Sequence, residues 1–135
     1  MASGTRAAVA TLLGAAAFYV LVDVVGAAQF GKFENPNPTL FARLGALWSI
    51  SLLVVPGALV ALLGNKRVPL LSAIAYLTGF LSHYLYHFGE WDQPPRPLTD
   101  MHLSLSDACA LIILGIVGAF VGLAGARVKR RLAKK

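Results

Sequence analysis

The sequence predicts an all-α integral membrane protein, built as one bundle of four transmembrane helices with both termini in the cytoplasm. Of its 135 residues, 57% are hydrophobic and only 13% are charged, whereas an ordinary soluble domain has roughly 25% charged residues. The mean hydropathy is +0.68, and so short a chain could not bury that much apolar surface in a soluble core. The composition excludes a disordered tail and a nucleic-acid-binding module, and the single cysteine, Cys109, excludes an internal disulfide framework.

The apolar residues fall into four stretches, each long enough to cross a bilayer as a helix of about 20 residues. We expect helices over about 7–30, 42–64, 68–89 and 102–126, followed by a basic cytoplasmic tail over 127–135. Backbone groups in lipid must be satisfied within their own segment, which favours helices. The alternating segments typical of a membrane β-barrel do not occur in the sequence.

The first predicted helix contains one charged residue, Asp23, and the second contains none after Arg43. A secretory signal peptide is the competing interpretation of the first segment, but its length and the presence of Asp23 favour a retained helix. Pro56 lacks a backbone donor and is expected to bend the second helix.

The third and fourth predicted helices carry features that indicate packing inside a bundle. In the third, His83 and His87 are the groups expected to titrate near neutral pH. In the fourth, small residues that allow close helix approach recur on one face: Gly115, Gly118, Gly122 and Gly125. Cys109, in apolar surroundings, is expected to be a small buried residue.

The charges divide between the two ends of the predicted bundle. One end carries nine basic residues and no acidic residue: Arg6, Lys66, Arg67, Arg127, Lys129, Arg130, Arg131, Lys134 and Lys135. The other end carries three basic residues and six acidic ones. Because basic residues stay on the cytoplasmic side, both termini are expected there, with the basic tail close to anionic headgroups.

A line of polar residues follows the third helix at helical spacing: Ser72, Tyr76, Gly79, His83, His87 and Glu90. Such a stripe is unfavourable against lipid, so it is expected to point into the bundle or toward a partner.

Asp23, His83 and Asp107 are predicted to lie at a similar depth near the acidic end, with His87 close by. A His-x3-His pair on one helix face can bind a transition metal, and either aspartate could complete the ligand set. A proton relay uses the same residue types. The structural interpretation is that the aspartates hydrogen-bond to the histidines and lock the bundle.

Two short motifs resemble a known family: Ala-Arg-Leu-Gly-Ala-Leu-Trp-Ser at 42–49 and Gly-Phe-Leu-Ser-His-Tyr-Leu-Tyr-His at 79–87. They are similar to the ergosterol biosynthesis scaffold family, known as ergosterol biosynthetic protein 28, which consists of small four-helix proteins of the endoplasmic reticulum. The family has a glutamate one turn after its histidine, where this chain has His87, and Glu90 is the substitute in this sequence.

The resemblance implies a non-enzymatic scaffold or accessory subunit that holds the membrane enzymes of sterol C-4 demethylation together. Arg43, Trp48 and His83 would be packing or partner-contact positions, joined by His87 and Glu90, and no cofactor is expected. The membrane would be the endoplasmic reticulum in a eukaryote, or the inner or plasma membrane in a prokaryote. The alternative is a metal-binding or proton-handling membrane protein that uses Asp23, His83, His87 and Asp107; a lipid-modifying enzyme ranks lower because no reaction motif supports it.

Overall fold

The computed structural model describes residues 3–29, 38–64, 66–88, 97 and 102–135, and all regular structure within them is helical. The four helices are α1 (Ser3–Gln29), α2 (Pro38–Leu63), α3 (Val68–His87) and α4 (Leu105–Leu132). Each contains a stretch long and apolar enough to cross a membrane. The predicted all-α class and the four membrane-compatible helices are therefore confirmed.

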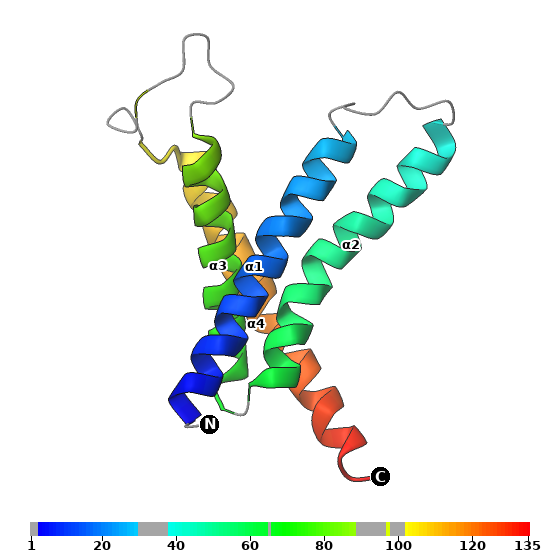
Figure 1. The fold of residues 1–135 in the computed structure, drawn as a ribbon, viewed down its shortest axis with the longest axis vertical. Coiled ribbons are helices and arrows are strands. Elements are labelled where there is room, and N and C mark those ends of the chain that lie inside the picture. Colours follow the sequence, from blue (N-terminus) through cyan, green and yellow to red (C-terminus); the bar gives the residue numbers. More distant parts are fainter. Residues whose placement is uncertain (1–2, 30–37, 65, 89–96, 98–101) are drawn as a thin grey trace.

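The helices pack as two pairs that cross near one end of the bundle. α1 contacts α2 and α3, and α4 contacts the same two helices from the other side. Both termini and the α2–α3 turn lie at the crossed end, while the α1–α2 pair and the α3–α4 pair diverge toward the other end (Figure 1). Nine of the twelve basic residues belong to the start of α1, the α2–α3 turn and the segment from Arg127 onward, all at the crossed end. Arg43, Asp23 and Asp107 lie toward the divergent end.

The ends of α4 differ from the expected bounds of 102–126. The helix begins at Leu105 because Ser104 is its N-cap, in a capping box with Asp107. It continues to Leu132, into the segment interpreted as a tail. Lysine and arginine are good helix formers, and they are favourable near the negative end of the helix dipole.

The first three residues of the polar stripe of α3 point into the bundle, as the helical spacing predicts, whereas Glu90 lies outside the described residues. Ser72 and Tyr76 are fully buried, and Gly79 is buried with them. The Tyr76 side chain hydrogen-bonds to the backbone of α2 on either side of Pro56. Its hydroxyl donates to the Leu53 carbonyl and accepts from the Gly57 N–H at 3.4 Å. The tyrosine thus occupies a position where the helical hydrogen bond from Gly57 to Leu53 would otherwise close.

Two glycines allow α3 to approach its neighbours closely. A Cβ atom at Gly122 of α4 would lie 2.6 Å from the Ser72 Cβ and 3.0 Å from the Val68 carbonyl oxygen. A Cβ atom at Gly79 of α3 would lie 2.8 Å from the Ala15 carbonyl oxygen of α1. The glycine face predicted for α4 is confirmed at Gly118 and Gly122, which are buried against α3.

The outer surface of the bundle is apolar. Large hydrophobic side chains are exposed on every helix, among them Leu12, Leu62, Leu70 and Phe120. Cys109 is also exposed, so the expectation that it is buried was wrong. An apolar residue on a membrane-compatible helix has two apolar environments available, the core and the outer surface, and composition does not distinguish them.

The crossed end is held by side chains that bind the carboxyl terminus of α2. Lys129 of α4 donates from Nζ to the carbonyl oxygens of Ala61, Leu62 and Gly64, at 3.3, 2.8 and 3.0 Å. Arg6 of α1 donates from Nε to the Leu63 carbonyl at 2.7 Å. These cations satisfy the terminal carbonyls that a helix leaves unpaired.

Candidate metal centre

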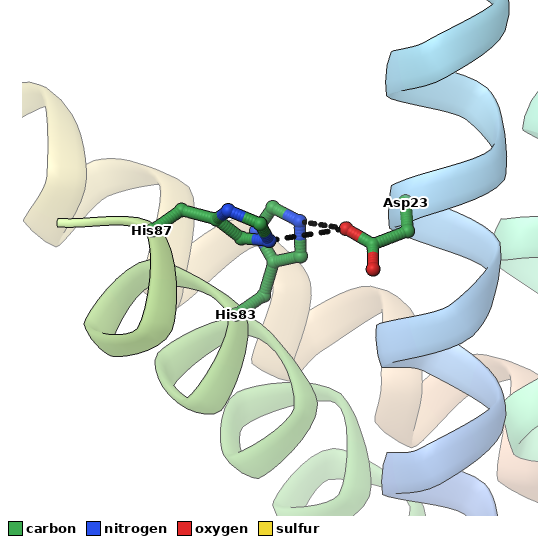
Figure 2. Close-up of side chains that lie close together, drawn as sticks. All are labelled: Asp23, His83 and His87. Atoms are coloured by element: carbon green, nitrogen blue, oxygen red, sulfur yellow. Dashed lines mark hydrogen bonds and ion pairs between the residues drawn. The ribbon is translucent and has the colours of Figure 1, made fainter. Parts of the chain in front are cut away.

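Three potential metal ligands from two helices meet on the side of the bundle where the helix pairs diverge. Asp23 projects from α1, and His83 and His87 project from adjacent turns of α3 toward it (Figure 2). Their spacing of four residues places both imidazoles on one face of α3. The group continues the stripe formed by Ser72, Tyr76 and Gly79.

Both histidines contact the same carboxylate oxygen. The Nε2 atom of His83 lies 2.8 Å from Oδ1 of Asp23, and the Nε2 atom of His87 lies 3.2 Å from it. One ligand atom from each residue lies within 4.8 Å of the others. The arrangement therefore presents two imidazole nitrogens and one carboxylate oxygen around a common point.

The cluster is accessible from outside the bundle. The side chains of His83 and His87 keep 25% and 23% of their surface exposed, and Asp23 keeps 46%. Asp23 lies six residues before the end of α1 at Gln29, and His87 is the last residue of α3. The ligand atoms thus lie in the part of α1 and α3 that is nearer the divergent end, and their side chains are partly open to the outside of the bundle.

Aromatic rings pack around the histidines and fix their orientation. The ring of Tyr19 meets His83 edge-on at a centroid distance of 5.4 Å, and Tyr86 meets His87 edge-on at 5.0 Å. The two imidazoles are themselves 4.4 Å apart. Tyr19 was not predicted as part of the site, although its place one turn before Asp23 puts it on the same face of α1.

The close approach of α1 and α3 at Gly79 brings the cluster together. Gly79 precedes His83 by one turn and packs against Ala15 and Phe18 of α1. Tyr19 and Asp23 follow Ala15 at successive turns of α1, so they lie on the same face of the helix as Ala15. A bulkier residue at Gly79 would separate the helices just below the three ligands.

Asp107 does not belong to this cluster, although the sequence predicted it as a ligand. Its Oδ2 accepts hydrogen bonds from the Ser104 backbone N–H at 3.0 Å and from the Ser104 hydroxyl at 2.7 Å. The Asp107 N–H donates to the Ser104 hydroxyl oxygen at 3.2 Å. The carboxylate is thus committed to the start of its own helix.

Two further predicted site residues, Arg43 and Trp48, are not among the three residues of this cluster. Arg43 is exposed on α2, and Trp48 is half-buried one turn further along the same helix. Within the described residues, the Asp23 carboxylate contacts His83 and His87 and neither of these two residues. Glu90 lies outside the described residues.

Comparison of the chain with protein-family models, with curated proteins and with solved structures gives no match. The fold and site alone therefore define the class of protein: an all-helical bundle of four membrane-compatible helices with an Asp/His cluster joining α1 to α3. The resemblance to the ergosterol biosynthesis scaffold family stays a prediction from two short motifs.

Proposed function

We propose that this chain is a multi-pass membrane protein that binds a divalent transition-metal ion through Asp23, His83 and His87. The observation that carries the proposal is the convergence of three ligand atoms from two helices within 4.8 Å. Titratable groups inside membrane-compatible helices are costly to place, which makes them candidates for a functional site.

The membrane orientation follows from the charge distribution. The apolar outer surface suits contact with lipid, and nine of the twelve basic residues belong to the end that holds both termini. The positive-inside rule then puts the termini in the cytoplasm and the Asp/His cluster toward the opposite side.

The ligand spacing suits a small divalent ion. In a tetrahedral zinc site, metal–ligand bonds of about 2.0 Å place neighbouring ligand atoms about 3.3 Å apart. The two imidazole–carboxylate separations, 2.8 and 3.2 Å, are close to this value. An ion would replace the two hydrogen bonds to the Asp23 carboxylate, and the imidazole and carboxylate ligands suit zinc, nickel or copper.

The three ligands found among the described residues leave a fourth position for water or another ligand. A three-ligand set with one open position is typical of zinc sites that exchange or activate a ligand, whereas purely structural sites usually close with four protein groups. The open position and the partial exposure of the side chains favour reversible metal binding over a permanent structural ion.

The competing interpretation is a hydrogen-bonded clamp between α1 and α3, and cobalt absorption separates the two. The purified protein in mild detergent would be titrated with Co²⁺, whose visible absorption reports on tetrahedral coordination. We expect one ion per chain, and loss of the signal in Asp23→Asn, His83→Ala and His87→Ala. His102→Ala is the matched control, because it removes the third histidine of the chain without touching the cluster.

A second variant keeps the test informative if an alanine substitution prevents folding. His87→Asp retains a ligand atom, so it should bind Co²⁺ with a shifted spectrum and lower affinity. A wild-type protein that folds and shows no cobalt signal would leave the clamp, or proton handling by the same three residues, as the function of the cluster.

The scaffold function implied by the family resemblance has its own test. Affinity purification from native membranes in mild detergent should recover several sterol-modifying enzymes in reproducible ratio if the chain organises them. Recovery of the chain alone would remove that function and leave the metal proposal untouched.

A further inference from the structure

A second site lies at the crossed end of the bundle, remote from the Asp/His cluster. A cavity of about 430 Å³ opens between the α2–α3 turn and the last turns of α4, a volume within the range of small-ligand sites. Its polar lining comes from Arg67, Lys129 and Arg130.

The three cations lie where no described acidic residue compensates them. The described carboxylates, Asp23 and Asp107, lie toward the divergent end. Lys129 is fixed in the cavity wall by its three carbonyl contacts at the end of α2. The Lys129 charge is therefore held in place before any ligand binds, which lowers the entropy cost of ordering this side chain on binding.

Arg67 is placed at the rim by an unusual backbone conformation. Its φ angle is 54°, which makes it the one described non-glycine residue in the left-handed region. Arginine is disfavoured there by roughly 1–2 kcal/mol. This conformation ends the turn between α2 and α3 and leaves the Arg67 side chain exposed beside the cavity.

The other lining residues are apolar, including Val68 and Leu123. Exposed hydrophobic side chains of the same helices, such as Leu70 and Val128, lie within a turn of the cavity residues along the chain. A ligand that matches both surfaces has an anionic head and an apolar body.

We propose that this cavity binds the phosphate headgroup of an acidic phospholipid, with an acyl chain against Val68 and Leu123. The guanidinium groups of Arg67 and Arg130 provide charge and donors for a phosphate, and Lys129, whose three donors bind the α2 carbonyls, adds charge. The inference goes beyond the proposed metal function and uses none of its residues.

Native mass spectrometry in detergent tests the proposal directly. Phosphatidylglycerol and phosphatidylcholine with identical acyl chains would be titrated onto the protein, with inorganic phosphate in a separate arm. The test variant is Arg67→Asn with Arg130→Gln, because asparagine tolerates the left-handed backbone. The matched control is Lys134→Gln with Lys135→Gln, which removes the same charge from the same end but from outside the cavity lining.

We expect phosphatidylglycerol to bind at least about tenfold more tightly than phosphatidylcholine. The test variant should lose roughly 30-fold in affinity for it, about fivefold for each cation removed, and the control should lose less than about threefold. If the double variant does not fold, Arg130→Gln alone serves as the test variant, and its affinity for phosphatidylglycerol should fall about fivefold.

Three results would overturn the proposal. Equal binding of the two lipids would show that the headgroup is not recognised. Equal losses in the test and control variants would reduce the effect to general charge attraction. Binding of inorganic phosphate as tight as that of phosphatidylglycerol would identify a free-anion site in place of a lipid site.

Discussion

The Nε2 atom of His83 lies 2.8 Å from Oδ1 of Asp23, a residue sixty positions earlier in the chain. This contact joins α1 to α3, and His87 adds a second contact to the same oxygen at 3.2 Å. Two neighbouring imidazoles around one carboxylate make a ready set of metal ligands, and also a hydrogen-bonded clamp. The experiments must therefore separate the loss of a ligand from the loss of a helix contact.

Substitution of Gly79 by alanine should weaken the metal site without changing a ligand. The new Cβ would lie 2.8 Å from the Ala15 carbonyl oxygen and 2.8 Å from the Phe18 Cβ, so α1 and α3 must separate. Overpacking of this kind typically costs about 1–3 kcal/mol. We expect a lower unfolding midpoint in detergent and a several-fold lower Co²⁺ affinity.

The control for that substitution is Gly45→Ala on α2, where a Cβ would meet nothing within 4 Å. Alanine is the better helix former, so this variant should be as stable as the wild type or more so. A Gly79→Ala protein with unchanged stability and metal affinity would contradict the packing at the α1–α3 contact.

Tyr76→Phe should destabilise the bundle near Pro56. The variant leaves the Leu53 carbonyl and the Gly57 N–H without the hydroxyl that contacts both. The expected loss is about 1 kcal/mol in the free energy of unfolding, measured by denaturant titration in mixed micelles. Tyr84→Phe removes a hydroxyl for which no hydrogen bond is found among the described residues, and the same titration should show little change.

Cysteine labelling should reveal the proposed orientation. In a Cys109→Ser background, Leu103→Cys and Lys135→Cys place single thiols at opposite ends of the bundle, both at exposed positions. A membrane-impermeant maleimide should label Leu103→Cys in intact cells, and Lys135→Cys only after permeabilisation. If Lys135→Cys is labelled in intact cells and Leu103→Cys only after permeabilisation, the membrane orientation is the opposite of the one proposed.

Metal binding should weaken as the pH falls. An imidazole nitrogen must be unprotonated to bind a metal ion, so protons and metal compete for His83 and His87. We expect the protein to retain less metal at about pH 5 than at about pH 8, as measured by metal analysis after gel filtration. Retention independent of pH over this range would argue against histidine ligands.

Helical spacing predicted which face of α3 is polar, and Ser72, Tyr76 and Gly79 are buried in the bundle as expected. The pairing of His83 with Asp23 depends on how closely α1 and α3 approach, and that is set by contacts between residues far apart in sequence, such as Gly79 with Ala15. Helical periodicity within one segment contains no information on that distance.

The role of Asp107 was mispredicted although the sequence contained a relevant signal. Ser104 and Asp107 have the spacing of a capping box, with aspartate in place of the usual glutamate. Depth in the predicted membrane placed Asp107 beside His83, but the nearer partner in the chain, Ser104, binds it.

X-ray absorption at the zinc edge, on the purified protein loaded with one equivalent of Zn²⁺, tests the central claim most directly. The account predicts two imidazole nitrogens and one or two oxygens in the first coordination shell, at about 2.0–2.1 Å. The spectrum should be unchanged in His102→Ala, and one imidazole should be lost in His87→Asp. A zinc shell of oxygens alone, or one identical in the wild type and His87→Asp, would contradict a metal site at Asp23, His83 and His87.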